Sequence, residues 1–193
     1  MASLRSISII GMFTSLIIAT NFLLFQFPNI KLEDTLVFSS AYAFGWKIGV
    51  SVAILSELIW GITSPYGFGG PIIPFLIAGE IIYAIAGALT SRVWGRIVNT
   101  RSAQNLFLGT IIAICAFLFD IETNVFTSIV VTGRLTVIGV LATIATGAWF
   151  MVTHELSDLI LGTYLAPIAI VYFLRRFPLE KIPKFVAGKE VQS

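Results

Sequence analysis

The sequence predicts an all-α integral membrane protein, a bundle of six transmembrane helices. Of its 193 residues, 57% are hydrophobic and only 11% are charged, whereas soluble domains carry about 25% charged residues. The apolar runs are also long and continuous, unlike the short alternating segments of a membrane β-barrel. We therefore expect one membrane domain, residues 1–193, with no separate soluble module.

Each predicted span is an apolar run bounded by polar or glycine-rich residues, since crossing a bilayer takes about 20 apolar residues. The spans are placed near residues 7–27, 33–45, 48–63, 72–90, 105–131 and 136–174, followed by a basic cytoplasmic tail, residues 175–193. The first span is expected to be retained, because it is long for a signal peptide and no clear cleavage site follows it. Cys115, the one cysteine, has no partner for an intrachain disulfide.

Two of the apolar runs can be divided into spans in more than one way. Residues 36–62 form either one tilted span or two short spans that turn at Gly45–Gly49, and residues 135–174 form either one bent span or two. The positions of the basic residues favour six spans with both termini in the cytoplasm, because lysine and arginine concentrate in cytoplasmic loops. Five spans with the N-terminus outside would fit the large loops almost as well, but Arg5 and Lys47 favour six.

Small residues recur at every fourth position of the first span, at Gly11, Ser15 and Ala19. Such a ridge lets another helix approach closely. Two interpretations remain open: packing against another helix of this chain, or docking of a separate membrane subunit.

Ionisable side chains within apolar runs are costly and therefore suggest functional sites. In the fifth run, Asp120, Thr123 and Asn124 share one arc of a helix, while Glu122 points roughly the opposite way. We interpret this arc as part of a polar ligand site. The alternative is a hydrogen-bond network that fixes helix packing.

The sixth run contains His154, the one histidine, with Glu155, Ser157 and Asp158. His154 and Asp158 are one helical turn apart, so the alternative to a ligand site is a histidine satisfied by its own helix. The pattern His-Glu-x-x-Asp is close to a zinc-protease motif, but catalytic zinc sites usually have two or three nitrogen ligands. The sequence therefore predicts no metal site and no cofactor.

Charge balance suggests what the site accepts. The apolar runs contain six carboxylate side chains and one candidate cation, His154. The carboxylates belong to Glu57, Glu80, Asp120, Glu122, Glu155 and Asp158. This imbalance favours a cationic or donor-rich ligand. The residues predicted to contact it are Asp120, Asn124, His154, Asp158 and Glu80, with Trp60 and Tyr66 as aromatic contacts near the outer end. The segments 120–124 and 153–158 are expected to face each other across the site.

The order of these features resembles the substrate-binding S components of energy-coupling factor (ECF) transporters for vitamins. The ridge of the first span is similar to that family's Ala-x-x-x-Ala docking face, although Gly11 and Ser15 stand where alanine is usual. Pro28–Asp34 followed by Phe44–Gly49 is similar to its outer loop, short second span and Gly-x-Lys-x-Gly turn. Three further segments, residues 65–68, 119–124 and 154–158, are similar to members of a less characterised branch.

The resemblance implies a multi-pass cell-membrane subunit that captures a small heterocycle and has no catalytic activity. It implies a ligand held in the outer half of the bundle, under the first and third outer loops. The implied partners are a transmembrane T subunit and two ATPases, and this chain itself contains no phosphate-binding loop. A flat, cationic B vitamin such as thiamin would suit the aromatic and acidic residues.

Three other functions remain open. An intramembrane enzyme would use His154 with Glu155 or Asp158 as its base. A self-sufficient secondary carrier would couple to protons through Asp120 and Glu80, although such carriers usually contain internal repeats, and none is evident here. A purely structural membrane subunit would tolerate loss of the carboxylates.

Overall fold

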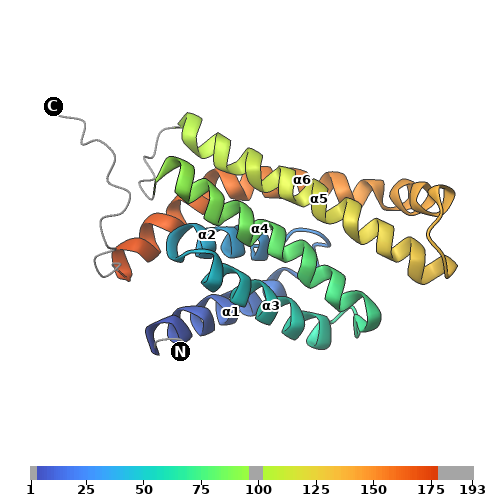
Figure 1. Ribbon diagram of the computed structural model, residues 1–193, viewed down its shortest axis with the longest axis horizontal. Coiled ribbons are helices and arrows are strands. Elements are labelled where there is room, and N and C mark those ends of the chain that lie inside the picture. Colours follow the sequence, from blue (N-terminus) through green and yellow to red (C-terminus); the bar gives the residue numbers. More distant parts are fainter. Residues whose placement is uncertain (1–3, 96–101, 178–193) are drawn as a thin grey trace.

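The computed structural model describes residues 4–95 and 102–177, and these residues form helices and no strands. Six α-helices and one short 3-10 helix follow one another along the chain (Figure 1). Their bounds are α1 Leu4–Leu24, α2 Glu33–Phe44, α3 Trp46–Thr63, η1 Gly70–Ile72, α4 Ile73–Trp94, α5 Ser102–Thr132 and α6 Val137–Arg176.

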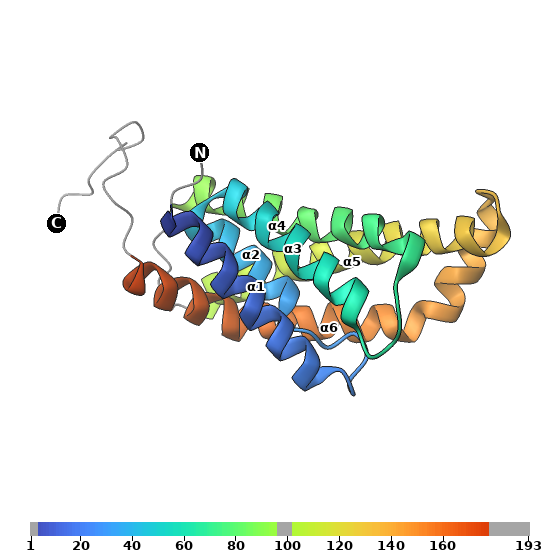
Figure 2. The same ribbon diagram turned by 90° about the horizontal axis from the view of Figure 1, so that it is seen from below.

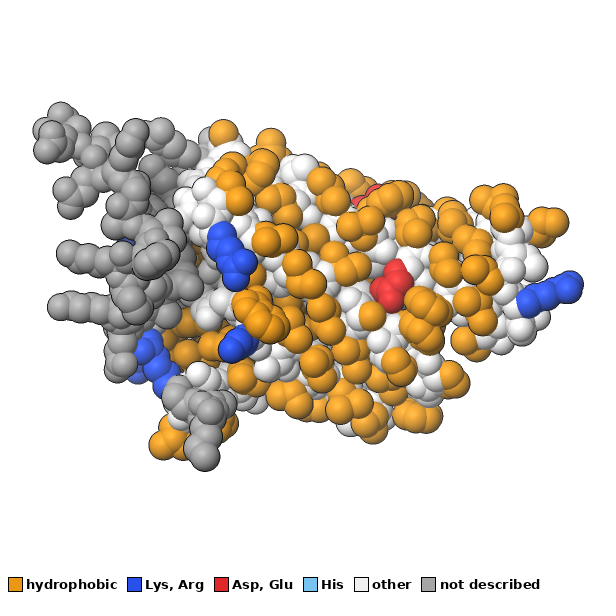
Figure 3. Space-filling model, in the orientation of Figure 1, with side chains coloured by type: hydrophobic (Ala, Val, Ile, Leu, Met, Phe, Trp, Pro, Cys, Tyr) orange, Lys and Arg blue, Asp and Glu red, His pale blue; other side chains and the backbone are white. Residues whose placement is uncertain are grey.

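Five of the six α-helices are long and apolar enough to cross a membrane: α1, α3, α4 with the preceding η1, α5 and α6. Hydrophobic side chains cover much of the face drawn in Figure 3, and each of these five helices also has large hydrophobic side chains exposed. An apolar exterior around buried polar groups suits a bilayer, where the surrounding solvent is hydrocarbon. These helices indicate a membrane protein.

Helix α2 differs from the others because it is short and lies in the centre of the bundle. Its 12 residues extend about 18 Å, less than the roughly 30 Å thickness of the hydrocarbon core. All its residues except the last, Phe44, are buried. Its first turn contains Glu33 and Asp34, and carboxylates stabilise the positive end of a helix dipole.

Gly45 separates α2 from α3, so residues 33–63 form two helices. The backbone of Gly45 has a φ of 95°, a conformation that glycine adopts without steric penalty. The break allows α2 to stay inside the bundle while α3 returns along its outside. Gly87 of α4 then lets α4 lie close to α2, because a Cβ atom at this position would collide with the carbonyl oxygen of Phe38.

The last long run is one continuous helix. Helix α6 contains 40 residues and begins at an N-cap, Thr136, whose side chain accepts a hydrogen bond from the backbone N–H of Gly139. Pro167 lies inside the helix without ending it. The helix bends in its first part, and α5 and α6 extend together beyond the other helices (Figure 2).

The start of α1, the α2–α3 break and the ends of α4 and α6 lie at the same end of the bundle (Figures 1 and 2). The basic residues of these segments are Arg5, Lys47, Arg92, Arg175 and Arg176. Arg96, Arg101 and the tail beyond residue 177 lie outside the described residues.

The small residues Gly11, Ser15 and Ala19 of α1 are all exposed. No atom lies within 4 Å of where a Cβ on Gly11 would be. The first interpretation of this ridge, that it packs against another helix of this chain, is therefore wrong for the residues that the structure describes. The ridge faces outward.

Candidate functional site

Polar side chains from four helices meet in the middle of the bundle. We call this cluster the polar core; its members are Asp34 of α2, Glu80 and Tyr83 of α4, Asp120 of α5, and His154 and Asp158 of α6. Each of these side chains is buried, with at most 5% of its residue surface exposed. Asp34 and Asp158 are 124 residues apart in the sequence. They meet because α2 lies against α4, α5 and α6.

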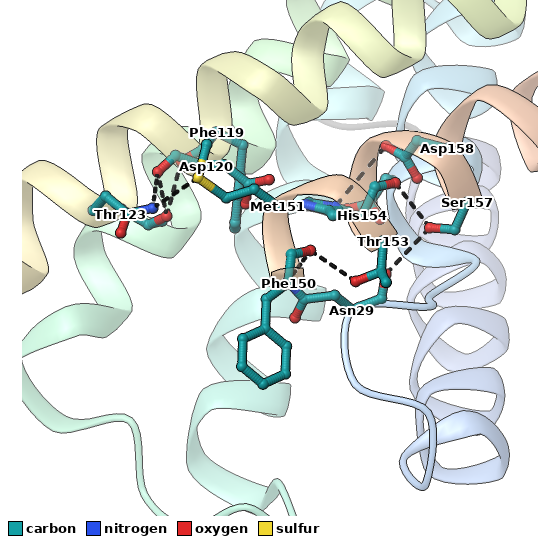
Figure 4. A network of polar contacts seen from close by, with 12 residues as sticks. Asn29, Phe119, Asp120, Thr123, Phe150, Met151, Thr153, His154, Ser157 and Asp158 are labelled. Carbon is teal, nitrogen blue, oxygen red and sulfur yellow. Dashed lines mark hydrogen bonds and ion pairs between the residues drawn. The ribbon is translucent and has the colours of Figure 1, made fainter. Parts of the chain in front are cut away.

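His154 is the centre of the polar core. Its Nδ1 atom lies 3.1 Å from Oδ1 of Asp120, and its Nε2 atom lies 3.4 Å from Oδ2 of Asp34 and 4.0 Å from Oδ2 of Asp158. Figure 4 shows His154, Asp120 and Asp158 directed toward one another. The segments 120–124 and 153–158 thus face each other, and they touch directly through His154 and Asp120.

Tyr83 joins α4 to this cluster. Its hydroxyl group donates a hydrogen bond of 3.0 Å to Oδ2 of Asp158, and neither residue has any exposed surface. A buried hydroxyl of this kind stabilises the carboxylate that would otherwise lack a donor.

A second set of acidic residues continues the cluster toward α1 and α3. Glu33 accepts a 2.7 Å hydrogen bond from Nδ2 of Asn21 and lies 3.7 Å from Nζ of Lys31. Glu57 is buried, and neither of its carboxylate oxygens has a hydrogen-bond partner among the described residues.

The position of Lys31 changes the balance of charges that the sequence predicts for the interior of the bundle. The sequence assigned it to an outer loop and left His154 as the single interior cation, which is wrong because the loop folds against the bundle. Burial opposes the charged form of Lys31, but the nearby carboxylates of Glu57 and Glu33 outweigh it, so the pKa of the ammonium group is raised above its ordinary value. The buried acidic residues still outnumber the two cations; they are Glu33, Asp34, Glu57, Glu80, Asp120 and Asp158.

The loop between α1 and α2 is fastened to α6 beside the polar core. Asn29 donates from Nδ2 to the carbonyl oxygen of Phe150 at 3.1 Å, and its own carbonyl accepts from the Ser157 hydroxyl at 3.2 Å (Figure 4). Its backbone has a φ of 60°, which asparagine tolerates better than most residues. The loop therefore covers the histidine from one side.

The remaining predicted residues of α5 and α6 lie around this centre. Asn124 donates from Nδ2 to the backbone oxygen of Asp120 at 2.7 Å and lies 3.6 Å from the sulfur of Met151. The hydroxyl of Thr123 bonds its own helix, at the carbonyl oxygens of Phe119 and Asp120. Glu155 is only partly buried and is not a member of the polar core.

Trp60 and Tyr66 lie in a separate pocket, which we call the aromatic pocket. Their ring centroids are 6.3 Å apart in an edge-to-face arrangement, and Nζ of Lys31 lies 5.9 Å from the centroid of Trp60. The Tyr66 hydroxyl donates to the carbonyl oxygen of Phe25. The pocket has a volume of about 150 Å³ and is lined by Asn21, Leu24, Phe25, Phe27, Asn29, Ile30, Lys31, Trp60 and Tyr66.

The aromatic pocket is small for a vitamin, since ligand pockets usually measure about 300–1,000 Å³. A larger hollow of about 700 Å³ lies beside α6, around Tyr164, Pro167 and Arg175, and contains none of the predicted site residues. It lies on the exterior of the bundle beside α6, away from the polar core, and is therefore not the candidate site.

Three groups of the polar core are placed to hold a metal ion. One donor atom from each of Asp34, His154 and Asp158 lies within 4.8 Å of the other two. The sequence missed this grouping because Asp34 lies far away in the chain and was assigned to the acidic outer loop where the second span begins. It also missed Asn21, Asn29 and Glu33, although the polar Asn21 within an apolar run was a detectable signal.

Comparison with known proteins gives no match: no family model, no curated protein and no solved structure is similar to this chain.

Proposed function

We propose that this chain is a multi-pass cell-membrane protein that captures a small solute as the S component of an ECF-type importer. The observation that carries the proposal is the buried polar core with an aromatic pocket beside it, inside a bundle with an apolar exterior. Ionisable groups in such surroundings suggest a functional site. In this proposal α2 counts as a sixth, short span and both termini are cytoplasmic.

The charges support a cationic solute. Six buried carboxylates accompany two cations, so a positively charged heterocycle would reduce the excess of negative charge. The faces of Trp60 and Tyr66 offer contacts for a flat ring and for a cation. Because the pocket is small, the α1–α2 loop has to open to admit a vitamin-sized molecule.

The exposed ridge of α1 supports a partner subunit. Gly11, Ser15 and Ala19 leave a smooth outward surface where a helix of a T subunit would fit closely. Two ATPases would then supply the energy that this chain cannot obtain itself.

The direct test is to purify the chain from cells grown with B vitamins and to identify co-eluting molecules by mass spectrometry. We expect a bound heterocycle, and an upward shift of Tm when it is added back. Finding no co-eluting molecule and no shift with any B vitamin would contradict the proposal.

Docking of a partner on the ridge of α1 is tested with a separate variant. Ser15→Trp should prevent co-purification with the T subunit while leaving solute binding intact. Leu16→Trp is the matched control, because Leu16 is also exposed but lies about 100° further around the helix. Equal loss of the partner in both variants would mean that the ridge is not the docking face.

An intramembrane enzyme is the second candidate, favoured by the contact between His154 and Asp120. A histidine held by a carboxylate is the usual arrangement of a general base and its orienting group. The hydroxyl of Ser157, one turn along the same helix, donates instead to the carbonyl oxygens of His154 and Asn29. His154→Gln separates the two candidates: it would abolish turnover by an enzyme but would weaken solute binding by a capture subunit.

A further inference from the structure

The polar core places three ligand groups around one point, as donor atoms of Asp34, His154 and Asp158 lie within 4.8 Å of one another. They come from α2 and α6, and all three residues are buried. We infer that the polar core binds one divalent transition-metal ion through these three side chains, with Asp120 as a positioning residue. The inference stands independently of the proposed function.

The distances fit ligands around an ion better than direct hydrogen bonds. Charge-assisted N–H···O bonds measure about 2.7–2.9 Å, whereas Nε2 of His154 lies 3.4 Å from Asp34 and 4.0 Å from Asp158. Two ligand atoms that are each about 2.1 Å from a tetrahedral ion lie about 3.4 Å apart. Small shifts of the Asp158 side chain would complete that geometry.

Asp120 holds the imidazole in the orientation that a metal ligand needs. Metal-bound histidines commonly donate the N–H of their other ring nitrogen to a carboxylate, and Nδ1 of His154 lies 3.1 Å from Oδ1 of Asp120. Without a metal ion, a proton on Nε2 makes His154 the cation between the carboxylates of Asp34 and Asp158. A bound metal ion would take the place of that proton, because the lone pair of the deprotonated Nε2 faces the same carboxylates.

Unpartnered oxygens point to the same ligand. Oδ2 of Asp34 and Oδ1 of Asp158 accept no hydrogen bond within the described part of the chain, although these residues are only 1% and 0% exposed. The one cation close to Oδ2 of Asp34 among those residues is His154, whose Nε2 lies 3.4 Å away. Burying a carboxylate oxygen without a partner is strongly unfavourable. Coordination to an ion would satisfy both side chains at once.

The donor set selects the class of ion. Imidazole favours zinc, iron and other transition metals, whereas sites made of oxygen alone favour magnesium and calcium. One nitrogen is fewer than most catalytic zinc sites have, which argued against a metal site when only His154 and Asp158 were considered. With Asp34 as a third ligand, the set fits Zn²⁺ or Mn²⁺ better than Mg²⁺. Three protein ligands also leave one position of a tetrahedral ion open.

The test uses the full chain in detergent, purified with a tag that lacks histidine. The protein is stripped with EDTA, reloaded with Zn²⁺, Mn²⁺ or Mg²⁺, desalted, and measured by inductively coupled plasma mass spectrometry. We expect about one Zn²⁺ or Mn²⁺ per chain and no retained Mg²⁺. Failure to retain any transition metal would overturn the inference.

Variants locate the ion. Asp34→Asn and Asp158→Asn should each weaken Zn²⁺ binding by at least about 10-fold, and Asp120→Asn by about 10-fold through the imidazole. Glu155→Gln removes a carboxylate next to His154 that is not a ligand, and should bind Zn²⁺ as the unaltered chain does. A loss in Glu155→Gln equal to that in Asp34→Asn would overturn the assignment.

The unaltered chain gives a readout that does not depend on the stability of variants. Because His154 is the one histidine in the sequence, an imidazole nitrogen seen by pulsed electron paramagnetic resonance on bound Cu²⁺ identifies this residue. Bound Cu²⁺ without an imidazole signal would overturn the inference. The samples for these metal measurements contain no vitamin. Their outcome therefore does not depend on whether the chain captures a solute, and the two proposals can fail separately.

Discussion

The polar core and the aromatic pocket lie side by side but are built in different ways. In the polar core, side chains from four helices bind one another directly, and His154 alone lies within 4.0 Å of three carboxylates. The aromatic pocket is partly open, holds about 150 Å³ and is closed mainly by the α1–α2 loop. The first region has charge but little space, and the second has space but little charge.

This difference suggests a division of roles within the proposed function. The polar core fixes the positions of α2, α4, α5 and α6 relative to one another and supplies an acidic floor. The aromatic pocket is the region that can change volume. Lys31 lies between the two regions, because it is close to Glu33, which neighbours Asp34 of the polar core, and to the ring of Trp60. Substitutions should therefore unfold the protein when they alter the core, and change solute binding when they alter the pocket.

The largest effect is expected from His154→Ala. Removing the cation leaves the buried carboxylates of Asp34, Asp120 and Asp158 without their shared partner, and breaking a buried ion pair costs about 3–5 kcal/mol. Unfolding in detergent, followed by circular dichroism, measures the change. Glu155→Gln on the same helix should change the free energy of unfolding by no more than about 0.5 kcal/mol. Similar values for both would mean that His154 does not organise the core.

A smaller loss is expected from Tyr83→Phe. The variant keeps the ring but removes the hydroxyl that donates to Asp158, and a buried acceptor without its donor costs about 1–3 kcal/mol. The matched control is Tyr164→Phe, because Tyr164 is 71% exposed. A measured difference below about 0.5 kcal/mol between the two variants would show that this hydrogen bond does not stabilise the core.

Lys31→Gln should have a weaker effect, up to about 1 kcal/mol, because the Lys31 side chain is 24% exposed and such pairs are partly screened. Its pKa is raised from an ordinary value of 10.5, so its stabilising contribution is fully present below pH 10.5. The contribution is lost as the pH rises from there toward the raised pKa. When unfolding is measured from pH 7 to pH 11, the difference in the free energy of unfolding between the unaltered chain and the variant should become smaller at the alkaline end. A constant difference would contradict this role.

The helical class and much of the polar core could be predicted from the sequence. Long apolar runs identify membrane helices, and the helical period brings His154 and Asp158 together. The turn at Gly45 was predicted and is present, but the approach of Asp34 was not, because it depends on the short α2 lying buried in the centre of the bundle. Local patterns contain no information about which distant helix fills the centre.

Lys31 shows the same limit of local reasoning. Its position between two apolar runs indicates a loop, and the structure does place it between α1 and α2. A loop residue is normally assigned to solvent, yet Asn29 fastens this loop to α6 and brings Lys31 against the acidic residues. The grouping of Trp60 and Tyr66 was predictable by contrast, since Trp60 lies in the last turn of α3 and Tyr66 in the loop directly after it.

Tyr66→Ala should affect stability least and therefore separates the two regions most clearly. Tyr66 is 59% exposed, so the change in unfolding free energy should stay within about 0.5 kcal/mol. Loss of one aromatic contact to a bound heterocycle, worth about 0.5–1.5 kcal/mol, should weaken its binding by up to about 10-fold. Isothermal titration with the co-eluting solute measures this, with Tyr164→Ala as the control. If Tyr66→Ala instead destabilised the chain as much as Tyr83→Phe, the aromatic pocket would be part of the structural core, and the division between a fixed floor and an adaptable pocket would fail.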